Sequence, residues 1–335
     1  MAENRVLVAG ASGYAGALAA ELVEGHPSLQ LVAATARSDV GSKLNDLYPR
    51  YSAEVELTEL DLGSLEDVDA AIVAYPHGAS APVVAEMRGL GIKVVDLSAD
   101  FRLRDIPTYE KWYGPHGEPD LLDGAVYGLT ELNREAVAGA ELVANPGCYP
   151  TAALLALAPL ATAGLVEDVV IDAKSGVSGA GRGAADEMEA VKESDDAKAY
   201  KVGAHRHTPE IAQELSALAS GNGALPVTFV PHLMPFDQGE LVSAYVSTSR
   251  PLSDAELAEL YEAAYGGEPF VELADAPPGV ADVRDTNICR VHVVAPEGGR
   301  VMAFSAIDNL WKGAASQAIQ NLNLMLGLPE EEGIS

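Results

Sequence analysis

The chain has 335 residues, 48% of them hydrophobic, which is enough for about two domains with full cores. Its 50 acidic residues against 21 basic ones give a net charge of −29, which argues against nucleic acid or an anionic membrane as a partner. Only two cysteines are present, and no export signal or long apolar run is visible, so we expect a cytoplasmic protein.

The N-terminal third alternates segments typical of strands with segments typical of helices. The expected strands are 5–9, 29–35, 70–74, 93–96 and 142–144, and the expected helices are 14–24 and 81–90. This alternation predicts an α/β fold, a doubly wound parallel sheet of the Rossmann type with crossover helices. We therefore expect a nucleotide-binding domain over residues 1–147.

The second half is richer in strand-forming residues. The expected strands are 168–174, 225–231, 240–248, 289–294 and 301–307, the last two paired with each other, and 311–328 reads as a helix. Long sequential strands are typical of a largely antiparallel sheet with helices on one face. We therefore expect a second domain, of α+β type, over 148–307.

A glycine loop, Gly10-Ala11-Ser12-Gly13-Tyr14-Ala15-Gly16, joins the first expected strand to the first expected helix. Its spacing is one residue longer than the usual G-x-G-x-x-G, but it still gives a tight turn and a helix N-terminus directed at a pyrophosphate. The expected contacts to a dinucleotide come from Gly10, Ser12, Gly13, Tyr14, Ala15 and Gly16.

The choice of cofactor depends on the end of the second expected strand. An acidic residue there binds the ribose 2′-hydroxyl of NAD, whereas this chain has Arg37 and Ser38, which suit the 2′-phosphate of NADP. Asp39 follows immediately and is the residue that would favour NAD instead.

Cys148 lies on a Pro-Gly turn, directly ahead of an apolar segment that reads as a helix. The positive end of a helix dipole favours thiolate over thiol, and a thiolate is a strong nucleophile. The alternative is that Cys148 is a small buried hydrophobic residue.

Three further segments carry polar side chains suited to chemistry. In 172–182, Lys174 and Arg182 could hold an anion, and the Ser178-Gly179 backbone could approach a cofactor, unless the loop is merely flexible. In 204–210, His205 and His207 precede an expected helix with Thr208 as N-cap and Pro209 as first residue.

Two histidines lack the third ligand that a zinc site needs, so we expect no metal and favour His207 as the base that activates Cys148.

In the third segment, 96–104, Arg102 is the expected contact to a substrate phosphate, while Asp100 is at least as well explained by a structural ion pair. A nicotinamide cofactor, a nucleophilic cysteine, a histidine and several cations together favour reduction of an acyl phosphate to an aldehyde through a thioester.

Several motifs resemble the N-acetyl-γ-glutamyl-phosphate reductase family of arginine biosynthesis, and they run from Val8 to about Gly327. They are N-P-G-C-Y-P-T, K-S-G-V-S-G-A-G-R, H-R-H-T-P-E, A-I-D-N-L-W-K-G-A-A, D-L-S-A-D-F-R and the glycine loop. The chain departs from the family in Thr130, within Y-G-L-T-E, and in Ala15, where the family has threonine.

The resemblance implies NADPH, a small-molecule acyl-phosphate substrate and the architecture of aspartate-semialdehyde dehydrogenase. It further implies a homo-oligomer, dimer or tetramer, with 148–307 as the catalytic and dimerisation domain. It also implies that the C-terminal helix, 308–335, returns to the nucleotide domain and that Asn309 lies near the nicotinamide. The expected catalytic residues are Cys148 and His207. The expected substrate-binding residues are Arg102, Asn145, Lys174, Arg182 and His205, and the further cofactor contacts are Ser178, Gly179 and Asn309.

Two other functions stay open on the sequence. One is a reductase of an aminoadipyl or glutamyl phosphate bound to a carrier protein. The family of such reductases has a motif like G-C-N-A-T-A around its cysteine, where this chain has Tyr149 and Pro150 after Cys148. The other is an NADP-binding redox sensor without turnover, in which Cys148 is the reporting thiol.

Overall fold

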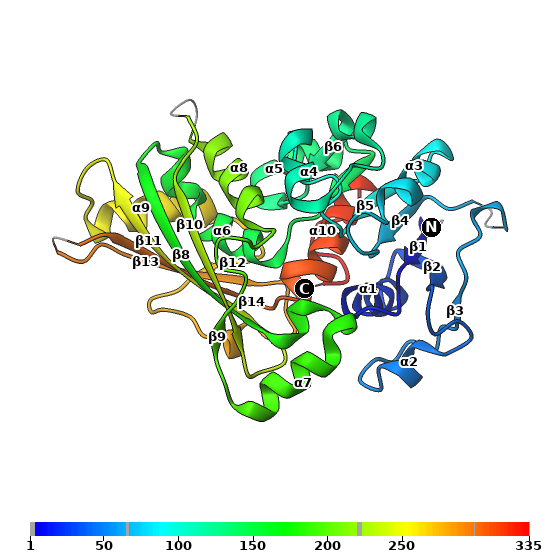
Figure 1. The fold of residues 1–335 in the computed structure, drawn as a ribbon. Coiled ribbons are helices and arrows are strands. Elements are labelled where there is room, and N and C mark those ends of the chain that lie inside the picture. The colour runs from blue at the N-terminus through cyan, green and yellow to red at the C-terminus, as the bar shows by residue number, and fades with distance from the viewer. Residues whose placement is uncertain (1–3, 65–66, 220–222, 298, 335) are drawn as a thin grey trace. The chain divides into compact units, whose positions relative to one another are not determined.

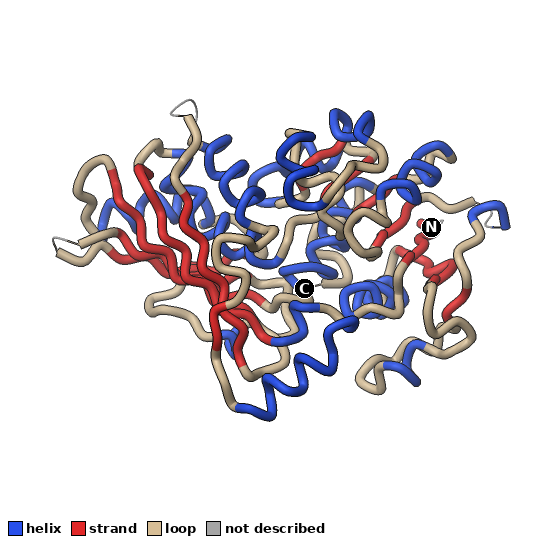
Figure 2. The backbone as a smooth tube through the Cα atoms, in the orientation of Figure 1, coloured by secondary structure: helices blue, strands red, loops and turns tan. Residues whose placement is uncertain are grey.

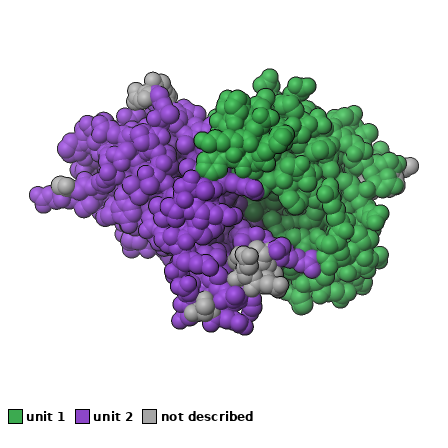
Figure 3. Space-filling view, viewed as in Figure 1, with its two compact units in different colours: residues 1–147, 314–335 green, residues 148–313 purple. Residues whose placement is uncertain are grey.

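The computed structural model describes residues 4–64, 67–219, 223–297 and 299–334, apart from the side chains of 64, 184–188 and 194. It divides into two compact units, residues 1–147 with 314–335, and residues 148–313 (Figure 3). Each unit contains one sheet and its own helices (Figure 2). None of the described helices is long and apolar enough to cross a membrane.

The first unit is built on a seven-stranded sheet in the order β3-β2-β1-β4-β5-β7-β6 (Figure 1). Its strands are β1 (Asn4–Ala9), β2 (Leu29–Thr35), β3 (Leu57–Thr58), β4 (Ala70–Val73), β5 (Lys93–Asp96), β6 (Ala125–Tyr127) and β7 (Leu142–Ala144). All pairings between these strands are parallel, which confirms the predicted doubly wound sheet. The two edge strands, β3 and β6, were not predicted, because two or three residues carry no periodicity.

The helices of this unit are α1 (Tyr14–Glu24), α2 (Leu44–Leu47), α3 (Ala81–Gly89), α4 (Ile106–Tyr113), α5 (Thr130–Ala138) and α10 (Ser316–Met325). Asp100 stabilises the start of α3, since its carboxylate accepts the backbone N–H groups of Gly78 at 2.7 Å and Ala81 at 3.0 Å. It also accepts the Tyr109 hydroxyl at 2.8 Å. These contacts make Asp100 a structural acceptor of N–H and O–H groups.

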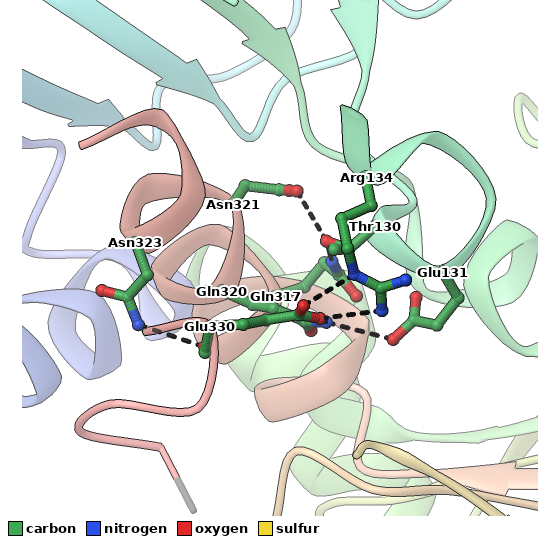
Figure 4. A network of polar contacts seen from close by, with 8 residues as sticks. All are labelled: Thr130, Glu131, Arg134, Gln317, Gln320, Asn321, Asn323 and Glu330. Atoms are coloured by element: carbon green, nitrogen blue, oxygen red, sulfur yellow. Dashed lines mark hydrogen bonds and ion pairs between the residues drawn. The ribbon is translucent and has the colours of Figure 1, made fainter. Parts of the chain in front are cut away.

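Helix α10 is held in the first unit by polar side chains that are unusually buried (Figure 4). Asn321 accepts the Thr130 hydroxyl at 2.8 Å, and the same hydroxyl oxygen accepts from the Gln317 amide at 2.8 Å. Gln320 donates to Glu131 and to Glu330, and Glu330 also pairs with Arg134. Because buried amides must be hydrogen-bonded, this network fixes how α10 packs on α5.

The second unit is built on a seven-stranded sheet in the order β12-β13-β14-β11-β8-β10-β9. Its strands are β8 (Val166–Gly176), β9 (Lys198–Ala199), β10 (Val227–Met234), β11 (Glu240–Thr248), β12 (Val271–Leu273), β13 (Cys289–Val294) and β14 (Val301–Ile307). The pairings β8–β10 and β12–β13 are parallel, and the other pairings between named strands are antiparallel. The predictions of a largely antiparallel sheet and of the β13–β14 pair are confirmed.

The helices of the second unit are α6 (Cys148–Thr162), α7 (Ala185–Ser194), α8 (Thr208–Leu218) and α9 (Asp254–Tyr265). Helices α6, α8 and α9 pack on one face of the sheet. One prediction was wrong: the N-cap of α8 is His207 and Thr208 is the first helical residue, because the turn that begins with His205 carries the chain into the helix one residue earlier. The expected helix 311–328 consists of a π-helical turn, Trp311–Ala315, followed by α10.

Candidate functional site

The glycine loop brings the start of α1 against the end of β1 in the first unit. Gly10 has φ +93°, and a Cβ there would lie 2.6 Å from the carbonyl oxygen of Ala74. A Cβ on Gly16 would lie 2.2 Å from the carbonyl oxygen of Gly10. Both positions therefore require glycine for the helix and strand to pack this closely.

The N-terminus of α1 is arranged to receive an anion. Its N-cap, Gly13, provides no side-chain cap, and the first turn contains no acidic residue. A Cβ on Gly13 would meet its nearest neighbour at 3.7 Å, an ordinary contact, so packing leaves room beside the loop. Tyr14 and Ala15 follow in the first turn, which points its N–H groups and the positive end of its dipole out of the loop.

A pocket of about 360 Å³ lies beside the end of β2, lined by Ala36, Arg37, Glu59, Leu60, Tyr75 and Val83. The Arg37 guanidinium lies over the Tyr75 ring, 4.9 Å from its centroid, and is exposed. Ser38 is also exposed, and its hydroxyl lies 3.3 Å from that of Ser12 in the glycine loop. The chain then turns away through Asp39, which has φ +65°.

Arg102 and Asn145 are buried in the first unit and bind protein groups there. Arg102 donates to the carbonyl oxygens of Asn145 and Leu97, each at 2.7 Å. The Asn145 amide donates to the Ala314 carbonyl at 3.1 Å and accepts from Asn321 at 3.0 Å. These hydrogen bonds link the segment that precedes Cys148 to strand β5 and to helix α10.

Cys148 is the first residue of α6 in the second unit and is half-buried. The helix that it begins is apolar and buried on every side, so its N-terminal dipole acts in a medium of low dielectric constant. Gly313 lies against it, since a Cβ on Gly313 would be 2.8 Å from the Cys148 Cβ. The predicted placement of a cysteine at a helix start is confirmed.

Glu240, the first residue of β11, is fully buried beside the cysteine. Burial raises the pKa of Glu240 to about 8, and interactions with the Cys148 thiol and the Ser175 hydroxyl oppose that rise. Neither carboxyl oxygen completes a hydrogen bond of ordinary geometry with a described residue. Glu240 was not predicted as a site residue, because only the fold brings β11 against the start of α6.

The two histidines of the 204–210 segment lie together with Tyr149, and the ring centroids of His205 and His207 are 4.9 Å apart. Nδ1 of His205 accepts the backbone N–H of His207 at 3.2 Å, so the ring proton lies on Nε2, which faces the Tyr200 oxygen at 3.3 Å. Tyr200 in turn donates to Tyr149 over 3.5 Å, and Tyr149 donates to the His232 carbonyl at 3.2 Å. Both ring nitrogens of His205 are thus occupied within the protein.

The same environment keeps His205 neutral. Burial, reinforced by the charges of Lys201 and Arg206, lowers its pKa to about 4. His207 is half-buried, and its ring centroid lies 5.9 Å from that of Tyr149, the residue next to Cys148. The ring centroid of His205 lies 5.6 Å from that of Tyr149, so the distances to Tyr149 do not separate the two histidines.

Asn309 joins the loop that follows β8 to the turn that precedes β11. Its amide donates to the Ser178 hydroxyl at 3.0 Å, and its carbonyl oxygen accepts the Gly239 N–H at 2.7 Å. Gly179 follows Ser178 and is exposed. The structure thus brings together three residues expected to contact the cofactor, although they are about 130 positions apart in the sequence.

The two cations of the 172–182 segment lie in different surroundings. Lys174 and Ser175 point to opposite faces of β8, and Ser175 faces the α6 side with Glu240. Lys174 instead pairs with Asp172 at 2.9 Å on the other face, so the fold does not bring it to Cys148. Arg182 begins a short turn beyond Gly181 and is half-buried.

Residues 5–140 match the family described as semialdehyde dehydrogenase, NAD binding domain, and residues 148–309 match semialdehyde dehydrogenase, dimerisation domain. The N-acetyl-gamma-glutamyl-phosphate reductase of Dehalococcoides mccartyi is 47% identical over 329 residues, which cover 96% of this chain and 95% of that protein. The reductases of Desulforudis audaxviator and Geobacter sulfurreducens are 48% and 46% identical, and each match covers 98% of this chain and 97% of the relative.

Solved structures show the same fold at low sequence identity. Aspartate semialdehyde dehydrogenase II from Vibrio cholerae has a TM-score of 0.75 and 19% identity, covering 97% of this chain and 99% of that one. Aspartate semialdehyde dehydrogenase with NADP from Candida albicans has a TM-score of 0.67 and 14% identity, covering 97% and 98%. The expected semialdehyde-dehydrogenase architecture is confirmed.

Proposed function

The chain belongs to the N-acetyl-γ-glutamyl-phosphate reductase family, and we propose that it reduces N-acetyl-γ-glutamyl phosphate to N-acetylglutamate 5-semialdehyde and phosphate. The relatives that carry this name match nearly the whole chain. The observation that carries the proposal is the position of Cys148 at the N-terminus of a buried apolar helix. A helix N-terminus favours the thiolate, and the thiolate is the form of cysteine that accepts an acyl group.

In the proposed reaction the Cys148 sulfur attacks the acyl carbon, phosphate leaves, and a thioester forms on the protein. NADPH, when bound, supplies the hydride that converts the thioester to a thiohemiacetal. The carbon–sulfur bond then breaks, releasing the aldehyde and returning the sulfur to the thiolate. Helix α6 stabilises the negative sulfur at the beginning and the end of this cycle.

We assign His207 as the group that takes the Cys148 proton and later protonates the oxygen on which charge develops. Its backbone N–H is fixed on His205, and its position as N-cap of α8 holds its Cα at the helix start. His205, with both ring nitrogens engaged and a pKa lowered to about 4, positions His207 and is a poor proton acceptor itself.

The residues of the first unit fit NADP. The uncapped N-terminus of α1 suits the pyrophosphate, and the exposed Arg37 and Ser38 suit a 2′-phosphate at the end of β2. Ser178, Gly179 and Asn309 are the corresponding candidates in the second unit, where the hydrogen bond from Asn309 to Ser178 holds the loop. Nucleotide binding is assigned to 1–147 with 314–335, and acyl transfer to 148–313.

We propose that Arg182, which begins the short turn after Gly181, helps to hold the substrate. Arg102, Asn145 and Lys174 are engaged with protein groups, so we assign the first two to positioning the segment before Cys148 and Lys174 to the Asp172 ion pair.

We place the protein in the cytoplasm, because a catalytic thiol must stay reduced to act.

We also propose a homo-oligomer, dimer or tetramer, formed through residues 148–309, which match a dimerisation domain. The face of the second sheet away from α6 carries half-exposed apolar side chains on three adjacent strands, including Val170, Tyr245 and Phe304. Such a face suits a partner's sheet. Replacing Tyr245 with arginine should lower the molar mass measured by sedimentation to that of a smaller assembly, and an unchanged mass would contradict this interface.

The substrate is tested by running the reaction in its oxidising direction with phosphate and NADP⁺. Free N-acetylglutamate 5-semialdehyde should be oxidised with a far higher kcat/KM than either the non-acetylated aldehyde or the carrier-bound analogue. A preference for the carrier-bound analogue would favour the alternative reductase, and absence of turnover with all three would favour a redox sensor.

A further inference from the structure

We propose that Glu240 and Cys148 titrate as a coupled pair, so that the charge on Glu240 sets the pH range over which Cys148 is a thiolate. Glu240 would then be a further residue of the nucleophile's site, acting directly on the reacting sulfur. The role of this pair in the reaction rests on the proposed function, in which Cys148 is the nucleophile.

The geometry around Glu240 supports this pairing. Its side chain is completely buried on the α6 side of the sheet, where residue 240 pairs with Ser175 of β8 and Ile307 of β14. The groups that act on its carboxyl are the Cys148 thiol and the Ser175 hydroxyl. Among the described residues no lysine or arginine forms an ion pair with it, so no positive side-chain charge compensates the charge of its carboxylate.

The other titratable groups that face Glu240 are the Tyr149 hydroxyl from α6 and the Tyr200 hydroxyl that follows β9. Burial raises the pKa of both tyrosines, so they remain neutral and the pair exchanges protons without them. The nearby Gly239–Asn309 hydrogen bond fixes the backbone that precedes Glu240. The carboxyl is therefore held in place beside a sulfur by neutral groups only.

Two consequences follow from the chemistry of such a pair. When the carboxyl is neutral, it donates its proton in a hydrogen bond to the thiolate and stabilises it. When the carboxyl is ionised, its negative charge opposes a second negative charge on the sulfur. In the resting protein one proton can move from Sγ to a carboxylate oxygen, which leaves a thiolate and a neutral carboxyl. The proton that leaves the pair altogether is the one that His207 takes. The two ionisations should therefore be spread over a wider pH range than that of an isolated thiol.

The test is the rate at which iodoacetamide alkylates Cys148 as a function of pH in the full chain, with mass spectrometry separating Cys148 from the buried Cys289. Wild-type protein should show two ionisation steps. Glu240→Gln should show one step with a lower midpoint, and roughly tenfold faster alkylation at a pH below the second wild-type step, because its side chain can still donate but cannot ionise. Glu240→Leu should show one step with a higher midpoint, because the donor is lost.

Glu214→Gln is the matched control, since Glu214 is also a buried glutamate of the second unit but lies on α8 and interacts with Gln213; its profile should equal that of wild type. Superimposable profiles for wild type, Glu240→Gln and Glu240→Leu would overturn the proposal. Alkylation needs no substrate, so this outcome is distinct from a failure of the proposed reaction, which the activity of Cys148→Ser measures.

Discussion

The backbone N–H of His207 donates to Nδ1 of His205 over 3.2 Å, which makes one histidine the support of the other. It fixes the tautomer of His205, and the Nε2 proton then continues through Tyr200 and Tyr149 to a backbone carbonyl. The result is a chain of hydrogen bonds that requires a neutral His205 and leaves the His207 ring to interact elsewhere.

Protonating His205 should therefore cost stability. Its pKa is lowered to about 4 in the folded protein, against 6.5 in a free histidine. Because the unfolded chain binds the proton first, the stabilisation is complete above pH 6.5 and is lost as the pH falls toward 4, by about 3 kcal/mol. Urea unfolding of wild type at pH 7.5 and 5 should show about 2 kcal/mol of this loss, and His205→Gln should show a smaller loss.

His292→Gln provides the comparison for that measurement, because His292 is half-exposed on β13 and hydrogen-bonds the Ala274 carbonyl. It should keep the wild-type pH dependence. An equal loss of stability in wild type and His205→Gln would contradict the assignment of a buried neutral histidine.

His207→Gln should lower kcat by roughly 10²- to 10⁴-fold, the usual contribution of a general acid or base, and leave NADP binding unchanged. The pH–rate profile should lose one ionisation at the same time. Steady-state kinetics over a pH series would show both effects. If His205→Gln caused the larger fall in kcat and removed that ionisation, the roles assigned to the two histidines would be reversed.

Alanine substitutions at two glycines of the dinucleotide loop should have different effects, one on the stability of the protein and the other on cofactor binding. Gly16→Ala places a methyl group 2.2 Å from the Gly10 carbonyl oxygen and should lower the free energy of unfolding by about 2 kcal/mol. Gly13→Ala meets its nearest atom at 3.7 Å, so it should change stability by less than about 0.5 kcal/mol and weaken NADPH binding instead. Thermal unfolding and fluorescence titration of both variants check this, and equal stability of the two would argue against the packing role of Gly16.

Arg37→Ala should weaken NADPH binding by roughly 10- to 100-fold, the value of a charge-assisted hydrogen bond to phosphate, and should hardly affect NADH. Lys43→Ala is the matched control, because Lys43 pairs with Glu54 and is not among the residues lining the pocket beside β2. Dissociation constants for both cofactors would be measured by fluorescence. An equal loss for NADPH and NADH in Arg37→Ala would refute the 2′-phosphate assignment.

Most of the fold was predictable, because the strands β1, β2, β4 and β5 are apolar runs and the glycine loop marks the first crossover. The edge strands β3 and β6 were not, since each is a segment of two or three residues that is defined by its pairing with a neighbouring strand. The N-cap of α8 was misplaced by one residue, because a Thr-Pro pair gives the same signal at N-cap and at the first helical position.

The site divides in the same way. The position of Cys148 at a helix start and the glycine loop could be predicted, because each depends only on residues that are close together in the sequence. Glu240 looks like an ordinary strand residue until β11 is placed against α6, and Lys174 looks like an anion ligand until the alternation of β8 turns it to the opposite face. Roles that depend on the face of a strand need the register of the sheet.

We propose that Cys148 carries the acyl group as a thioester, and a reaction without phosphate isolates that step. Without phosphate the thioester cannot be released, so rapid mixing with N-acetylglutamate 5-semialdehyde and NADP⁺ should give a burst of NADPH equal to the concentration of chains, followed by slow turnover. Adding phosphate should restore fast turnover, and Cys148→Ser should give no burst while still binding NADP⁺. A burst of equal size in Cys148→Ser, or fast turnover of wild type without phosphate, would contradict the thioester.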